Sequence, residues 1–461
     1  MMTFINLIYF IAAVLFIFGL KQMSSPVTAR KGIIWAGIGM VLATIVTFVH
    51  EAGQHDFASY FLINIVGIAI GGSIAWVTCK KVEMTDMPQM IALYNGMGGG
   101  AAAAISAVIL IQQEHADHTI VQSMAVLGAL IGSMAFSGSL VAYAKLQGIM
   151  KKTFRFPNQQ LTNGITFLVV VLLGIYIATS GTSYGIFTLF IFFALALIFG
   201  VMSTAPIGGA DMPVVISLYN AFTGLAVGFE GYVLEIPAMM IAGIVVGSAG
   251  TLLTQLMAKA MNRPISNVLF SNFGEVSGAA QEVTGSMKEI EASDAAIQMA
   301  FASKVIIIPD YGMAVAQAQH KIWEMTKLLQ ERGVEVKFAI HPVAGRMPGH
   351  MNVLLAEAGV PYDIIADLDE INEEFATTDV ALVIGANDVV NPAARTDQNS
   401  PIYGMPILNA DYASNVIVMK RGKGKGFSGI ENHLFFEDNT RMLYGDAQAS
   451  ANKLVATIKE L

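Results

Sequence analysis

The sequence predicts a membrane domain of about nine helices, followed by a Rossmann-like α/β domain with a doubly wound parallel sheet. Only 13% of the 461 residues are charged, whereas 54% are hydrophobic and the mean hydropathy is +0.60. An average soluble domain is about a quarter charged, so much of this chain must lie in lipid. Long apolar segments fill residues 1–265, and short apolar runs alternate with helical stretches in residues 294–461. That alternation is typical of a parallel sheet covered by helices.

Nine segments in the first 265 residues are long and apolar enough, or nearly so, to cross a bilayer, which requires roughly 17–25 residues. They are Thr3–Leu20, Ile33–His50, Tyr60–Thr78, Pro88–Ile111, Val121–Ala144, Leu161–Ser180, Ile186–Met202, Pro213–Phe229 and Ile236–Ala258. The first has no basic residues before it and no clear cleavage site after it, so we interpret it as a span. The single cysteine, Cys79, excludes an internal disulfide.

The basic residues of this region predict its orientation. Every Lys and Arg before residue 265 follows an odd-numbered segment. The connections after even-numbered segments are assigned only acids and histidines, including Glu51, Asp56, Glu114, Asp117, Glu230 and Glu235. The positive-inside rule then places the N-terminus outside and the C-terminal domain in the cytoplasm. A net charge of −8 without a basic stripe argues against nucleic acid as a partner.

An internal repeat occurs within the membrane domain. Residues Asp86–Asn95 match Asp211–Asn220, and both copies lead from a cytoplasmic loop into a span. The Asp-Met-Pro start suits a helix N-cap followed by proline in the first turn. A buried amide is costly unless it is satisfied, so Asn95 and Asn220 should face each other, water or a polar path. Two roles for these asparagines remain open: they form hydrogen bonds between helices and nothing more, or they line a hydrated ion path.

Among the histidines of the sequence, only His50 lies in or beside one of the predicted spans. Its side chain could carry a proton, or it could be an interfacial residue beside Glu51.

From Ser266 to Ser293, Ser, Gly, Glu and Ala dominate, which is linker composition. We therefore expect a transmembrane domain at 1–265, a linker at 266–293 and a nucleotide-binding domain at 294–461.

The C-terminal domain alternates predicted strands and helices. The strands are placed near Val305–Ile308, Glu335–Ile340, Asp363–Ile365, Val380–Ile384, Pro406–Leu408 and Val416–Met419. The helices are placed near Met313–Arg332, Met351–Ala358 and Asp446–Glu460. In a doubly wound sheet, ligands bind at the loops that follow the carboxyl ends of the strands.

Three of these loops carry unusual sequence. The first strand leads through Asp310-Tyr-Gly into a helix, as in a dinucleotide-binding unit, although Asp310 takes the place of the first fingerprint glycine. An ordinary βα turn is the alternative. His341–Asn352 and Ile384–Ala394 follow two further strands. Lys420–Phe427 places four cations among glycines, which could hold the 2′-phosphate of NADP(H) or form a solvated hairpin.

Long runs of this sequence resemble the beta subunit of proton-translocating nicotinamide nucleotide transhydrogenase, over essentially the whole chain. They include Tyr-Gly-Met-Ala-Val-Ala-Gln-Ala-Gln at 311–319, the run from His341 to Ala358, Val-Ile-Gly-Ala-Asn-Asp at 383–388, and Gly-Gly-Ala-Asp-Met-Pro at 208–213. The resemblance implies Re/Si-specific hydride transfer from NADH to NADP+, driven by protons returning into the cell. It implies NADP(H) on this chain, NAD(H) on a companion alpha subunit, a dimer of the alpha-beta unit, and a bacterial inner-membrane location.

The resemblance also implies roles for particular residues. The residues expected to approach the pyrophosphate are Tyr311, Gly312, Ala314 and Val315. The residues expected to lie along the cofactor are His341, Ala344, Gly345 and Arg346. Asn387 and the catalytic candidate Asp388 would lie near the nicotinamide. Lys420 and Arg421 would bind the 2′-phosphate, with Gly422 to Phe427 as a lid. The expected proton path comprises Asn95, Asp211, Asn220 and His50, within a domain embedded in membrane lipid.

The sequence departs from the family pattern at three positions. Asp310 replaces a glycine, Phe427 stands where tyrosine is expected, and Asn95 stands where some relatives carry a histidine. The protonatable group is therefore His50 or a residue of the companion subunit. A competing hypothesis is a secondary ion transporter whose cytoplasmic domain senses a nucleotide, which predicts ion flux without hydride exchange.

Overall fold

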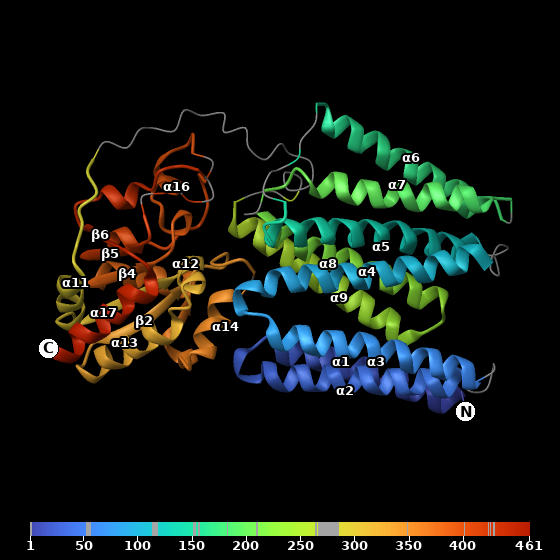
Figure 1. Ribbon diagram of the computed structural model, residues 1–461, viewed down its shortest axis with the longest axis horizontal. Coiled ribbons are helices and arrows are strands. Elements are labelled where there is room, and N and C mark those ends of the chain that lie inside the picture. The colour runs from blue at the N-terminus through green and yellow to red at the C-terminus, as the bar shows by residue number, and fades with distance from the viewer. Residues whose placement is uncertain are drawn as a thin grey trace. The chain divides into compact units, whose positions relative to one another are not determined.

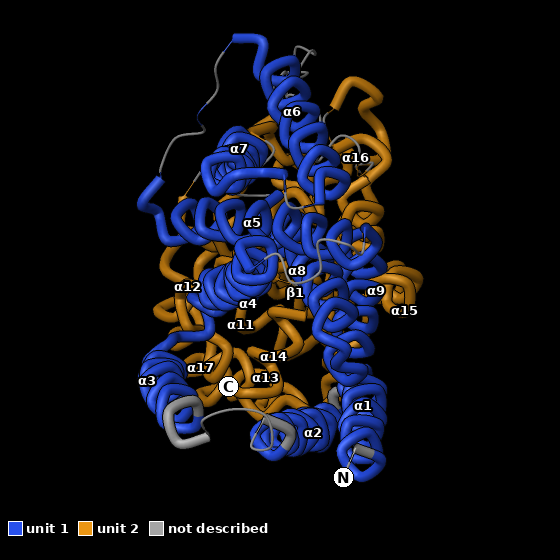
Figure 2. Tube along the Cα trace, turned by 90° about the vertical axis from the view of Figure 1, so that its right-hand side faces the viewer, with its two compact units in different colours: residues 1–254 blue, residues 255–461 orange. Residues whose placement is uncertain are grey.

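The computed structural model describes residues 2–461 except 52–56, 113–118, 151–153, 155–156, 182, 209–210, 263–264, 266–284, 348, 401, 423, 425 and 427–428. The chain forms two compact units, Met1–Thr254 and Gln255–Leu461, which Figure 2 colours separately. Most of the predicted linker lies outside the described residues. The assignment of functions to residues 1–265 and 294–461 stays a prediction.

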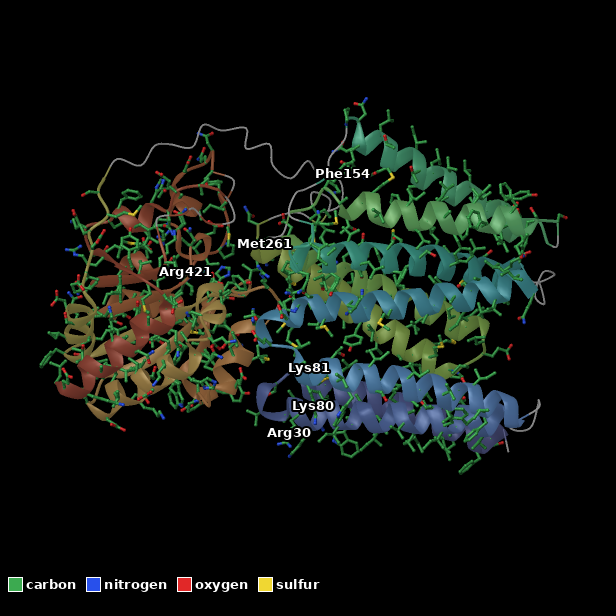
Figure 3. The ribbon with its side chains drawn as sticks, in the orientation of Figure 1. Arg30, Lys80, Lys81, Phe154, Met261 and Arg421 are labelled. Carbon is green, nitrogen blue, oxygen red and sulfur yellow. The ribbon has the colours of Figure 1, made fainter. Side chains whose placement is uncertain are left out.

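Within the described part of the chain, nine helices are long and apolar enough to cross a membrane. They are α1 (Met2–Met23), α2 (Pro26–Glu51), α3 (Phe57–Lys81), α4 (Met87–Gln112), α5 (Thr119–Leu146), α6 (Gln159–Thr179), α7 (Ile186–Thr204), α8 (Met212–Val233) and α9 (Pro237–Ala260). Each coincides with one predicted span to within a few residues at either end, so the predicted helical membrane domain is confirmed. Arg30, Lys80 and Lys81 lie at one end of this helical unit (Figure 3).

Helix α5 lies at the centre of the helical unit, where it contacts α4, α6, α7 and α8 (Figure 2). Small residues allow these backbones to approach closely, as is typical of helix pairs in lipid. A Cβ atom on Gly132 of α5 would lie only 2.7 Å from the backbone oxygen of Gly99 on α4. On α3, by contrast, the apolar side chains are exposed, which suits a surface that contacts lipid.

Two acids that the sequence assigned to connections belong to helices instead. Glu51 is the last residue of α2, and Glu230 lies in the last turn of α8. Glu230 is fully buried, and its carboxylate accepts a hydrogen bond from the hydroxyl of Ser106 on α4. The prediction for Glu230 was wrong because this partner, which donates to one of the two carboxylate oxygens, lies 124 positions away in the sequence.

The described residues of the second unit form a six-stranded parallel sheet in the order β3-β2-β1-β4-β5-β6 (Figure 1). The strands are β1 (Lys304–Pro309), β2 (Glu335–Ile340), β3 (Ile365–Asp367), β4 (Val380–Ile384), β5 (Asn415–Lys420) and β6 (Thr440–Tyr444). Strand order reverses between β1 and β4, which confirms the predicted doubly wound, Rossmann-like sheet.

One predicted strand is wrong and one was missed. Residues 406–408 form no strand, because their backbone groups bond elsewhere: Ile407 O accepts from the Asn372 amide at 2.9 Å, and Leu408 N donates to Val389 O at 2.9 Å. Strand β6 was not predicted, and the predicted strand Asp363–Ile365 is displaced onto β3.

Helices cover both faces of the sheet. One face buries Ile306, Val383 and Val418 against a cluster that includes Phe375 and residues of α15 (Leu368–Ile371) and α16 (Ala393–Thr396). Because side chains alternate along a strand, the residues between these point to the other face. On that side, α13 (Gln319–Glu331) contacts β2, and α17 (Ala447–Glu460) contacts β5, α13 and α11 (Ala292–Ala300).

The predicted helix Met313–Arg332 is divided in two. A short helix, α12 (Tyr311–Val315), ends before Gln317, whose φ of 50° interrupts the helical path, and α13 begins at Gln319. The next helix, α14 (His350–Glu357), lies where one was predicted. The break makes α12 a short element directly after β1, at the edge where ligands bind in this fold.

Candidate nucleotide site and polar helix interface

The loops that follow β1 and β4 meet at the point where the strand order reverses. A Cβ atom on Gly312 would lie 2.5 Å from the Cα atom of Gly385, closer than real Cβ contacts come. Gly385 has a φ of +65°, which L side chains rarely adopt. The two backbones are therefore in direct contact, and this contact fixes the spacing of the two loops at the carboxyl ends of β1 and β4.

Gly312→Ala is expected to lower the free energy of unfolding by roughly 3 kcal/mol, because the added methyl group forces the two loops apart. The measurement is the thermal unfolding midpoint of the purified chain. Gly422→Ala is the matched control, since a Cβ atom there would meet nothing within 4 Å. Equal midpoints for the two variants would contradict the close approach of these loops.

Asp310 links the loops after β1 and β2. Its φ of −144° is extended, so the position does not require glycine, and the turn forms without it. Its Oδ1 accepts hydrogen bonds from Tyr311 N and Gly345 N, both at 2.7 Å. Burial raises the pKa of Asp310 to about 7, against the effect of these two bonds, and nearby Asp388 shifts it in the same direction as burial.

This raised pKa predicts a pH-dependent stability. The folded chain holds the Asp310 proton up to about pH 7, whereas the unfolded chain releases it near pH 3.8, so this stabilisation is lost as pH rises between these values. We expect the free energy of unfolding to fall by about 2 kcal/mol over this pH range. A fully buried group would lose about 1.4 kcal/mol for each unit of pKa shift, and the loss is smaller here because Asp310 is partly solvated. Thermal unfolding across this pH range should show a smaller decline in Asp310→Asn. The exposed Asp363→Asn is the control, and identical profiles for Asp310→Asn and wild type would disprove the assignment.

The loop after β2 is held by two buried histidines. His341 is 2% exposed, and its Nδ1 accepts from Val343 N at 3.2 Å, so its Nε2 donates to Pro406 O at 2.8 Å. His350 Nδ1 accepts from Arg346 N at 3.1 Å. Burial lowers the pKa of each histidine to about 4, which keeps both rings neutral. His341 therefore positions this loop, and its predicted contact with a cofactor stays a prediction.

Arg346 brings the β2 loop over the β1 loop. Its guanidinium lies 4.2 Å from the centre of the Tyr311 ring. Gly345, with a φ of +92°, lies so close to His350 that a Cβ atom would be 2.5 Å from its Nδ1. Ala314 and Ala344 are buried beneath these groups, whereas Val315 is exposed. The structure thus gathers the predicted residues of both loops at one edge of the sheet.

The basic loop after β5 returns to the loop after β4. A Cβ atom on Gly426 would lie 2.5 Å from Asp388 Oδ1 and 3.0 Å from the Asn387 amide, so this residue of the basic loop lies against the pair. Lys420 packs 4.7 Å from the centre of the Phe435 ring, and burial lowers its pKa. Arg421 and Gly422 are exposed. Phe427, the expected lid residue, lies outside the described residues.

Asn432 is a site residue that the sequence analysis missed. It is 2% exposed, and its amide donates to Asn387 O at 2.9 Å and to Asn387 Oδ1 at 3.2 Å. It thereby fixes the orientation of the Asn387 side chain beside Asp388. No local pattern distinguishes Asn432, because its contact depends on a residue 45 positions away.

In the helical unit, polar contacts follow the interface of α4, α5 and α8. Asn95 Nδ2 donates to Ser139 Oγ at 3.1 Å, and Thr223 Oγ1 donates to Asn95 O at 3.4 Å. Asn95 is therefore bonded to α5 rather than to Asn220, which lies partly buried on α8. Asp211 occupies the N-cap position of α8, but its side chain makes no capping hydrogen bond to the helix. The residue is buried, with 5% of its surface exposed. His50 belongs to α2, and its side chain is outside the description.

A family model described as NAD(P) transhydrogenase beta subunit matches residues 5–457. The chain belongs to this family. Two NAD(P) transhydrogenase beta subunits from Rhodospirillum rubrum, one of them assigned to a particular strain, are each 47% identical to it over 462 residues. The alignment covers 97% of this chain and 97% of each relative. The similarity thus includes both the helical unit and the α/β unit.

Membership of the transhydrogenase family has two direct consequences. The family binds nicotinamide nucleotides, and a beta subunit has an alpha subunit as its partner. Together with the nine candidate spans in the described residues, it makes the chain a membrane-protein subunit of an NAD(P) transhydrogenase. The earlier resemblance to this family is confirmed.

Proposed function

We propose that this transhydrogenase beta subunit couples hydride transfer from NADH to NADP+ with inward proton translocation. The observation that carries the proposal is the gathering of four strand-end loops at one sheet edge, in a chain that also holds a polar interface among membrane helices. Nicotinamide rings supply the hydride chemistry when bound. The protein residues bind and orient them, and no protein nucleophile or metal is needed.

NADP(H) is assigned to the α/β unit and NAD(H) to the alpha subunit. Arg421 and Lys420 supply cations for charge-assisted bonds to a 2′-phosphate, which NAD(H) lacks. The exposure of Arg421 and the open space at Gly422 support this assignment. Tyr311, Gly312, Ala314 and Val315 border the pyrophosphate position. Asp310 favours a phosphate there when it is neutral, below the pKa of about 7.

Asp388 is assigned the role of linking protonation to cofactor release. It lies beneath Gly426 of the basic loop, so a change in its charge acts directly on the segment that covers the cofactor. Hydride exchange between such similar cofactors is nearly thermoneutral. One proton crossing ~200 mV supplies ~4.6 kcal/mol. That is enough to shift a ratio roughly a thousandfold.

The proposed topology places the N-terminus outside and the α/β unit in the cytoplasm of a bacterial cell. Arg30, Lys80 and Lys81 at one end of the helical unit support it through the positive-inside rule (Figure 3). We further propose a dimer of alpha-beta units in the inner membrane, with Re/Si-specific hydride transfer. The proton path is assigned to Asn95, Asp211 and Asn220.

The proposal is tested with the alpha-beta complex in inside-out vesicles supplied with NADPH and an NAD analogue. Reduction of the analogue should acidify the lumen, and an uncoupler should raise the rate of reduction. Hydride exchange without any pH change would contradict coupling. Ion flux without hydride exchange would favour the ion-transporter hypothesis.

A further inference from the structure

A carboxylate with no assigned function is enclosed by three membrane helices. Glu230 of α8 is 0% exposed, and its Oε1 accepts a hydrogen bond from Ser106 Oγ of α4. Gly128 of α5 forms the third wall, because a Cβ atom at that position would collide with Oε1. Among the described residues, no hydrogen-bond partner exists for the second oxygen, Oε2.

The surroundings of Glu230 disfavour the ionised form of its carboxyl group. An ionised carboxylate inside a helix bundle is costly unless a cation or several donors compensate it. Ser106 is its one hydrogen-bond donor in the described chain, Gly128 offers no side chain, and no described Lys or Arg forms an ion pair with it. Burial among these helices therefore costs the ionised carboxylate more free energy than the neutral carboxyl.

Glu230 lies on the polar interface already described, at the end opposite Asp211. Thr223 is seven residues before it on α8, which corresponds to about 10 Å along the helix. Thr223 bonds to Asn95, which in turn bonds to Ser139. Asn95 and Asn220 can orient a proton path but cannot bind a proton near neutral pH, whereas a carboxyl group can.

We propose that Glu230 is the residue that binds the translocated proton in the outer half of the membrane domain. The inference rests on the proposed coupling and orientation. Oε2 takes up one proton from the outer phase while Ser106 holds Oε1, and the same proton is released towards Asn95. The carboxyl returns to its starting state, so no other reactant is consumed.

The test compares Glu230→Gln with Glu235→Gln in vesicles that contain the alpha-beta complex. Glutamine keeps the size and hydrogen bonding of the side chain but binds no proton. Glu230→Gln should reduce the rate of lumen acidification at least ~100-fold, because a proton-transfer group usually contributes a factor of this size. Its NADPH affinity should remain at the wild-type value, which shows that the protein is folded. Glu235 is exposed just beyond α8, so Glu235→Gln should pump normally.

A structural role gives different results. If Glu230 only fills space and accepts the Ser106 bond, Glu230→Gln pumps within about twofold of wild type, and the inference is overturned. If Glu230→Gln does not assemble, Glu230→Asp decides the question through its pH profile. Pumping with a displaced pH profile supports the proposal, and an unchanged profile refutes it. Wild-type vesicles that exchange hydride without a pH change would instead refute the underlying coupling.

Discussion

Arg421→Ala is expected to raise the Kd for NADPH by roughly 30-fold, because one charge-assisted bond to a phosphate contributes about 2 kcal/mol. Arg421 is exposed directly after β5, with the exposed Gly422 beside it. Affinity for NADH, which lacks the 2′-phosphate, should change little. The variant should therefore lose selectivity between the two nucleotides rather than all nucleotide binding. Isothermal titration of the purified chain with each nucleotide measures both values.

The control for this prediction is Lys453→Ala, which removes a cation from the exposed side of α17. Its Kd for NADPH should match that of wild type, since Lys453 lies outside the strand-end loops. If Arg421→Ala and Lys453→Ala bind NADPH equally well, the 2′-phosphate is held elsewhere. A parallel loss of NADPH and NADH affinity would point to collapse of the site instead.

Asn220→Leu should reduce proton pumping by on the order of 100-fold while leaving the Kd for NADPH unchanged. Asn220 is partly buried on α8, between Asp211 and Thr223, so leucine replaces a polar group on the proposed path with an apolar one. The measurement is lumen acidification in vesicles, with NADPH titration as the test of folding. Normal pumping in Asn220→Leu would exclude this position from the path.

Asn64→Leu provides the matched control, because it makes the same change on the exposed face of α3. That helix lies outside the α4–α5–α8 interface, so pumping should be retained. Loss of pumping in both variants would indicate a general effect on the helical unit. Only a difference between them assigns the effect to the polar interface.

The membrane helices could be predicted because each span is a long apolar segment, a property of the local sequence. Glu230 shows where this approach ends. A charged residue terminates an apolar run in the sequence, so it was assigned to a connection, yet α8 continues through it to Val233. The hydroxyl of Ser106 and the space beside Gly128 accommodate it, and both come from other helices.

The α/β unit shows the same limit. Strands β1, β2 and β4 are short apolar or alternating runs, and they were predicted nearly residue for residue. Pro406–Leu408 has similar composition but forms no strand, because side chains and loops take its backbone groups. At the site, Asp310 departs from the fingerprint, yet its extended φ shows why no glycine is needed. Asn432 and the contact of Gly426 with Asp388 depend on folding and have no local signal.

We propose that proton movement through the helical unit controls how tightly the α/β unit holds NADP(H). The most direct measurement is the rate of NADPH release from the reconstituted alpha-beta complex, with and without an acid lumen in inside-out vesicles. We expect faster release when protons flow from the lumen, and a return to the slower rate on addition of an uncoupler. Equal release rates with and without the gradient would contradict it.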